Sequence, residues 1–255
     1  MYSEEINKVS AAAVMKSKFL KKSKMRYLTS AALAGIYVGF GILLIFTIGG
    51  LLSESGSPAT KIVMGASFGI ALSLVIMAGS ELFTGNNMVM TIGSLEKKVT
   101  WMDSINIWIF SFVGNFVGSI VVATLFVGGG LAKGSAATFI LKVSQGKMAM
   151  PTMELFLRGI LCNMLVCLAV WCAFKLKEET AKLIMIFWCL FAFITTGFEH
   201  SIANMTLLSV SLMIPHGAAI SAGGLAHNLL WVTLGNFVGG AVFIGTAYWY
   251  ISKDK

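Results

Sequence analysis

The chain contains the same short pattern twice, each time inside a long apolar stretch. Both copies read Gly-x-Glu and end on an asparagine five residues after the carboxylate, Glu81 with Asn86 and Glu199 with Asn204. A second shared string, Gly-Asn-Phe-Val-Gly, follows each copy, at residues 114–118 and 235–239. This duplication indicates two halves built from one unit. Because a charged group is costly inside a bilayer, a repeated pair of interrupted apolar segments points to a transport site between the repeats.

The composition places the chain in a membrane. Hydrophobic residues make up 57% of the 255 residues and charged residues only 12%, and the mean hydropathy is +0.84. Soluble domains are far more polar. Crossing a bilayer takes at least about 18 apolar residues. Six runs are long enough, at residues 27–52, 60–94, 103–128, 152–175, 181–213 and 225–251.

The distribution of basic residues predicts the orientation. With the N-terminus inside, fourteen lysine and arginine residues fall in cytoplasmic segments and four in external segments. Because basic loops remain inside, we expect both termini in the cytoplasm and the protein in the plasma or inner membrane. The net charge of +8 then indicates topology and contact with anionic membrane lipid. It does not indicate a nucleic acid partner, which would need a basic folded surface.

We expect one all-α integral membrane domain made of two halves. Repeat one covers about residues 1–128, an external linker about 129–150, and repeat two about 151–255. Three spans per half is an odd number, so the second half enters from the opposite side and the repeats are inverted. Spans two and five run to about 35 and 33 residues, longer than a ~30 Å core requires at ~1.5 Å per residue. We therefore predict breaks at residues 82–87 and 201–204.

Three strings carry a resemblance to a known family. They are Glu-Leu-Phe-Thr-Gly-Asn-Asn at residues 81–87, Arg-Gly-Ile-Leu-Cys-Asn at 158–163 and Gly-Phe-Glu-His-Ser-Ile-Ala-Asn-Met at 197–205. In this order, within a six-span inverted repeat, they resemble the signatures of the formate/nitrite transporter family over the whole chain. The Thr-Gly-Asn-Asn-Met form of the first string, which starts at Thr84, is most similar to the hydrosulfide channel branch.

The resemblance implies an aquaporin-like fold with broken helices two and five, and a homopentamer in which each protomer has its own pore. It implies as substrates small inorganic or organic monovalent anions of weak acids, such as formate, nitrite, acetate, lactate and hydrosulfide. The substrate pathway of the family corresponds to Thr84, Asn163 and His200. The apolar constrictions on either side of the histidine correspond to four residues: Phe68, Leu72, Leu82 and Phe193.

The chemistry of these residues agrees with such roles. An imidazole titrates near pH ~6.5, so the surroundings of His200 decide its charge, and an anion that meets it can leave as the neutral acid. Phe193 lies seven residues earlier and on the same helical face, where an apolar neck would exclude hydrated metal ions. The Thr84 hydroxyl both donates and accepts, so it can pass an anion or a proton toward His200.

The repeated carboxylates are expected to have a structural role, because a carboxylate repels an anion. We expect Glu81 and Glu199 to accept backbone N–H groups from the opposite broken segment and to brace it. The same bracing is expected of two amides: Asn86 and Asn204. Lys16 and Lys147 are expected to raise the local concentration of anions at the two mouths of the pore.

Each role has a structural alternative. His200 can be a buried histidine tied to Glu199, Thr84 a helix cap, Asn163 an interhelical hydrogen-bond donor, and Lys147 a solvated loop charge. No metal site or cofactor is expected, because the cysteines and histidines have no ligand-type spacing.

Other functions were weighed against an anion pore. An aquaporin-like neutral-solute pore would also use paired asparagines at helix breaks, but the chain lacks Asn-Pro-Ala and contains His200. An intramembrane enzyme using Glu199 and His200 would need a nucleophile or metal ligands, and catalysis is not expected. A sensor or scaffold would need a soluble output domain. Hydrosulfide is the favoured substrate.

Overall fold

The computed structural model describes residues 2–253, and within them every regular element is helical. The α-helices of the first half are α1 (Ser3–Lys22), α2 (Lys24–Glu54), α3 (Thr60–Ser67), α4 (Ile70–Leu74), α5 (Phe83–Leu95) and α6 (Trp101–Gly128). The second half contains α7 (Gly134–Met148), α8 (Thr152–Lys175), α9 (Glu179–Thr196), α10 (Ser201–Met213), α11 (Ala222–Phe237) and α12 (Ala247–Ile251). Two π-helical segments, η1 (Val75–Gly79) and η2 (Val238–Thr246), continue α4 and α11.

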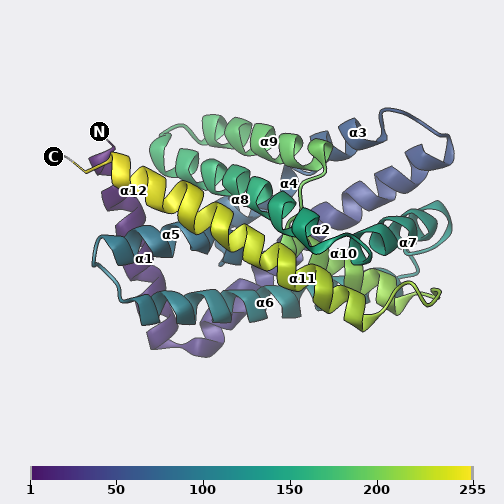
Figure 1. The fold of residues 1–255 in the computed structure, drawn as a ribbon, viewed down its shortest axis with the longest axis horizontal. Helices are drawn as coiled ribbons and strands as arrows, with labels where there is room; N and C mark the ends of the chain where they lie inside the picture. The colour runs from purple at the N-terminus through teal and green to yellow at the C-terminus, as the bar shows by residue number, and fades with distance from the viewer. Residues whose placement is uncertain (1, 254–255) are drawn as a thin grey trace.

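These elements form the six spans expected from the sequence. The helices long and apolar enough to cross a membrane are Lys24–Glu54, Thr60–Gly79, Trp101–Gly128, Thr152–Lys175, Glu179–Thr196 and Ala222–Ile251. The long helices run roughly along the longest axis of the molecule, and both termini lie at one end of it (Figure 1). The predicted all-α membrane fold is confirmed.

Spans two and five are both broken, although the breaks lie earlier than predicted. The extended segments are residues 80–82 and 198–200, whereas most of 82–87 and all of 201–204 are helical. Gly79 and Gly197 end the preceding helices with φ angles of +80° and +81°, which favour glycine. The predicted first break is therefore wrong for residues 83–87, because buried polar partners hold Asn86 in a helix.

Glycines bring the spans of each half close together. A side chain at Gly118 of α6 would collide with the Ala32 carbonyl of α2. In the second half, Gly235 of α11 lies equally close to the Phe156 carbonyl of α8. These contacts build the same helix pair in each half, as expected when small residues set the interhelical distance.

Two further helices cover the ends of the spans. The basic N-terminal arm is the helix α1, which lies across the helix ends beside both termini and buries Val9, Ala13 and Leu20 (Figure 1). The predicted linker 129–150 contains α7, which packs against α2 and α10. Both helices bring a lysine to a break, Lys16 from α1 and Lys147 from the end of α7.

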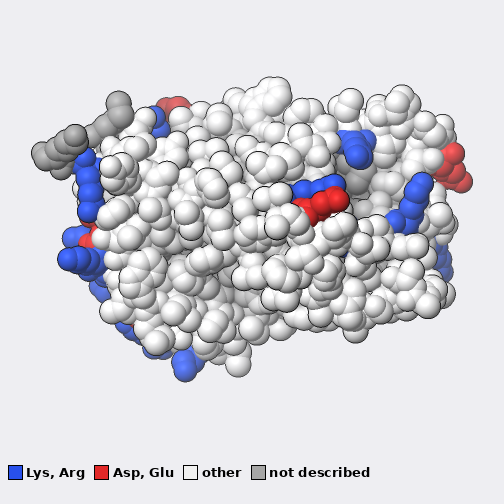
Figure 2. Space-filling model, in the orientation of Figure 1, with Lys and Arg blue, Asp and Glu red and all other residues white. Residues whose placement is uncertain are grey.

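Charge is concentrated at the two ends of the long axis. In Figure 2 the middle of the visible face is almost entirely white, apart from one cluster of basic and acidic side chains. The end that carries the termini has many lysine and arginine side chains. This distribution matches an apolar band in the hydrocarbon core and basic residues at one membrane surface.

Candidate functional site

The two breaks are held by equivalent asparagines. At the first break, Asn115 accepts a hydrogen bond from Phe83 N (2.9 Å) and donates to Glu81 O (2.9 Å) and Ala31 O (2.7 Å). Asn115 therefore replaces the helical partners that the first broken span lacks.

Asn236 makes the same three contacts at the second break. It accepts from Ser201 N (2.8 Å) and donates to Glu199 O (2.9 Å) and Gly159 O (2.8 Å). One side chain thus satisfies three backbone groups in each half. Both asparagines come from the duplicated Gly-Asn-Phe-Val-Gly string, so the repeat seen in the sequence preserves a hydrogen-bonding device.

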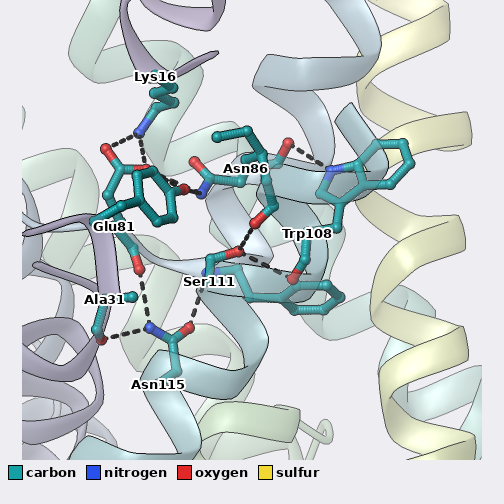
Figure 3. A network of polar contacts seen from close by, with 10 residues as sticks. Lys16, Ala31, Glu81, Asn86, Trp108, Ser111 and Asn115 are labelled. Atoms are coloured by element: carbon teal, nitrogen blue, oxygen red, sulfur yellow. Dashed lines mark hydrogen bonds and ion pairs between the residues drawn. The ribbon is translucent and has the colours of Figure 1, made fainter. Parts of the chain in front are cut away.

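Glu81 is the centre of a polar network on the side of the termini (Figure 3). Lys16 Nζ lies 2.8 Å from both of its carboxylate oxygens, and the Tyr27 hydroxyl donates to Oε2 at 2.8 Å. Asn86 Nδ2 donates to the same oxygen at 3.1 Å, and Trp108 Nε1 donates to the Asn86 carbonyl at 3.1 Å. This network ties α1, α2 and α6 to the first break.

Glu199 has a smaller network of the same kind. Lys147 Nζ lies 2.6 Å from Oε1, and Asn204 Nδ2 donates to Oε2 at 2.7 Å. Asn204 also donates to Asn228 Oδ1 at 2.8 Å. In this pair only 17% of the lysine side chain and 3% of the glutamate side chain are exposed, so the ion pair is largely shielded from water.

The partners of the two carboxylates differ from the prediction. Both glutamates bind lysine and amide side chains, not backbone N–H groups of the opposite break. The reason is that Asn115 and Asn236 already accept a free N–H at each break, and a carboxylate at this depth needs a cation nearby. Lys16 and Lys147 consequently lie in ion pairs, and their role in attracting anions stays a prediction.

His200 and Thr84 connect the two breaks. Leu82 and His200 occupy equivalent positions, each directly before the helix that follows the break. His200 Nδ1 accepts a hydrogen bond from Ala203 N at 3.1 Å, so in the neutral ring the proton is on Nε2. Nε2 lies 3.1 Å from Thr84 Oγ1 and donates to it, which leaves the Thr84 hydroxyl proton free to donate.

Three cavities follow one another through this region. The first, about 410 Å³, lies beside Glu81 and Lys16, and the third, about 310 Å³, lies beside Glu199 and Lys147. The small cavity between them holds only about 10 Å³, roughly the space of one water molecule.

Four of the predicted residues separate these cavities. Leu72 and Leu82 line both the first and the middle cavity, whereas Phe193 and His200 line both the middle and the third. Phe68 lines the middle cavity and meets Phe193 edge-on with ring centroids 5.5 Å apart. The Phe193 and His200 rings are nearly parallel, with centroids 6.0 Å apart. The four residues named as constrictions therefore all line the middle cavity. Leu72 and Leu82 also face the first cavity and Phe193 the third, whereas Phe68 lines the middle cavity alone.

Asn163 and Thr84 lie behind the cavities. Asn163 Nδ2 donates to Thr84 O (3.2 Å) and Asn236 O (2.6 Å), and neither Asn163 nor Thr84 lines the three cavities. The sequence analysis missed Tyr27, Asn115 and Asn236. Only the repeated Gly-Asn-Phe-Val-Gly string could have identified the asparagines, whereas nothing near Tyr27 in the sequence marks it.

Comparison with known proteins identifies the family. The sequence model described as "Formate/nitrite transporter" matches residues 3–250. The chain belongs to the formate/nitrite transporter family. The nitrite transporter NirC of Escherichia coli (strain K12) is 47% identical over 98% of this chain and 92% of the relative. The formate channel BtFdhC of Bacillus thuringiensis is 35% identical over 85% of this chain and 83% of its own length.

Solved structures of the family have the same fold. A structure titled "FNT family ion channel" superposes with a TM-score of 0.93 at 44% identity, covering 98% of this chain and all of that chain. A structure titled "Pentameric formate channel with formate bound" has a TM-score of 0.81 at 29% identity and covers 91% and 98%. The protein is thus a multi-pass membrane channel of the formate/nitrite transporter family for small anions. The expectation that it is not an enzyme is confirmed.

Proposed function

We propose that each protomer conducts small monovalent anions of weak acids through the three cavities, past His200. The proposal rests on the arrangement of the cavities. A water-sized apolar cavity separates the two larger ones and meets the first at Leu72 and Leu82 and the third at Phe193 and His200. The constriction admits a partly dehydrated species and excludes hydrated metal ions.

His200 supplies a hydrogen-bond donor at this constriction. Its Nε2–H points to Thr84 Oγ1, and an anion in the middle cavity can compete for that proton with the hydroxyl. Because Nδ1 is occupied by Ala203 N, the ring is held in one orientation while Nε2 exchanges partners. Thr84 lies behind the wall of the middle cavity, so its Oγ1 holds the imidazole in place and does not touch the anion itself.

Hydrosulfide is the substrate that we favour, and nitrite is the second candidate. A cavity of about 10 Å³ has room for roughly one water molecule, and the diatomic hydrosulfide is nearest to water in size. The relatives named nitrite transporters, 47% and 46% identical, support nitrite, and the formate channel supports formate. Formate and nitrite would require Phe68 or Phe193 to move.

We also propose an oligomeric state for the protein and an orientation in the membrane. The neighbour titled a pentameric formate channel supports a homopentamer. The excess of lysine and arginine at the end that carries the termini supports a cytoplasmic location for both termini in the plasma or inner membrane.

Liposome flux measured side by side for hydrosulfide, nitrite, formate and water tests the function. His200→Asn retains a side chain that can cap α10 but shortens the reach of the donor. We expect anion flux to fall at least about 10-fold, the loss of one hydrogen bond to a charged group, and the pH profile to change. His216→Asn is the matched control, because exposed His216 contacts only the neighbouring Gly217 carbonyl and lines none of the three cavities.

Two results would contradict the proposal. One is unchanged anion flux in His200→Asn at every pH. The other is rapid water flux with no anion flux in the unmodified protein, which would favour the neutral-solute pore.

A further inference from the structure

A basic pocket lies between the α5–α6 turn and α12, outside the anion pathway. Its volume is about 650 Å³. Three lysines line it, together with hydroxyl and indole groups: Lys97, Lys98, Lys253, Thr100, Trp101 and Trp249. Lys253 Nζ lies 3.8 Å from the centre of the Trp249 ring, and so the cation and the indole form one wall.

The acidic groups beside the pocket are already bound. Asp103 lines it and forms an ion pair with Lys21, whereas Glu96 accepts a 2.7 Å hydrogen bond from Trp249 Nε1. Lys97 and Lys98 are exposed and have no carboxylate partner among residues 2–253. The pocket therefore has an excess of positive charge.

Lys97 stands where helices normally place glycine. Its φ angle is +56°, and Lys98 N donates to Gly93 O across the end of α5, the arrangement that usually has glycine in the left-handed position. A lysine there strains the backbone, because its Cβ crowds the following carbonyl oxygen in the left-handed conformation. The strained residue also places its ammonium group at the rim of the pocket, which favours an anionic ligand there.

An apolar track continues from the pocket along α6. Trp101 lines the pocket and is 50% exposed, and three side chains at helical spacing follow it on the surface: Met102, Ile105 and Ile109. A free phosphate ion would use only the lysines. A phospholipid would use both parts, with its phosphate at the lysines and an acyl chain along the exposed face.

We propose that this pocket binds the head group of an anionic phospholipid. The phosphate lies between Lys97 and Lys98, and the two indoles hold the glycerol region at the membrane surface. The bound lipid would join the α5–α6 turn to the last span of the protein.

Native mass spectrometry of the intact assembly in detergent tests this site. The protein is titrated with dioleoyl-phosphatidylglycerol, dioleoyl-phosphatidylcholine or inorganic phosphate. Each basic residue near an anionic head group is worth a factor of about 5, so Lys97→Gln with Lys98→Gln should weaken phosphatidylglycerol binding roughly 30-fold. The matched control, Lys18→Gln with Lys177→Gln, removes the same charge from exposed positions outside the pocket and should change binding less than twofold.

Several outcomes decide the matter. Equal binding of phosphatidylcholine, or equal loss of affinity in both double variants, would overturn the proposal. Competition by millimolar inorganic phosphate would assign the pocket to a soluble anion instead. A lower assembly mass in Lys97→Gln with Lys98→Gln would show that the surface contacts a second copy of the chain. Retained phosphatidylglycerol binding in Lys97→Arg with Lys98→Arg would support a charge-based site.

Discussion

The hydrogen bonds of Asn236 should make a measurable contribution to the free energy of unfolding. Asn236→Ala removes three bonds, from Ser201 N and to Glu199 O and Gly159 O. Interhelical hydrogen bonds in membrane proteins contribute about 0.6 kcal/mol on average and about 1.7 at most. Three of them therefore amount to about 2–5 kcal/mol.

Asn87 provides a control of the same residue type. Like Asn236 it is fully buried, but neither of its amide atoms has a hydrogen-bond partner among the described residues. Asn87→Ala removes the same atoms and creates a cavity of similar size without breaking a hydrogen bond. Because removing an unpaired buried amide also relieves its desolvation, the difference between the two variants is an upper bound on the contribution of the Asn236 hydrogen bonds.

Reversible unfolding in mixed micelles with increasing dodecyl sulfate gives the free energies. Protein concentration is held constant, because the stability of an assembly depends on it. We expect Asn236→Ala to lower the free energy of unfolding by about 2–5 kcal/mol more than Asn87→Ala does. If the two variants differ by less than about 0.5 kcal/mol, the inference that these asparagines hold the breaks together is refuted.

Two further outcomes follow from the contacts of the breaks. Lys147→Gln leaves Glu199 buried without its cation and should lower the free energy of unfolding by about 3–5 kcal/mol. The double variant Lys147→Gln with Glu199→Gln should recover most of that loss. Lys142→Gln, at an exposed position, is the control in the same unfolding assay and should change little. Thr84→Val nearly keeps the shape of a fully buried side chain but removes the partner of His200 Nε2. Vesicle flux should slow, and the free energy of unfolding should fall by about 0.6–1.7 kcal/mol, the contribution of one interhelical hydrogen bond. Full flux in Thr84→Val would restrict Thr84 to a structural role.

Much of the architecture was predictable because it depends on local properties. Apolar length predicted six spans, and the excess length of spans two and five predicted that both are broken. The exact breaks were not predictable from turn propensity. Gly85 and the asparagines after it favour a turn in isolation, but Gly79 takes the left-handed conformation and Asn86 is bonded to Glu81 within a helix.

The candidate site was also predictable only in part. The resemblance to the family pointed to four residues, and the structure brings all four to the walls of the middle cavity: Leu72, Leu82, Phe193 and His200. The same reasoning gave Asn163 a place on the pathway, whereas its amide is used between the two breaks. A motif identifies which residues matter, but the direction of each side chain depends on neighbours supplied by other helices.

The amino-acid sequence by itself determined the membrane setting, the inverted duplication and the places where charge enters apolar spans, because these follow from composition and spacing along one chain. Only the tertiary structure decided how those charges are stabilised. Lys16 meets Glu81 across 65 positions of sequence, Lys147 meets Glu199 across 52, and Thr84 meets His200 across 116. Such pairings depend on how the spans pack, since a buried carboxylate takes its cation from whichever helix the fold brings within about 3 Å of it.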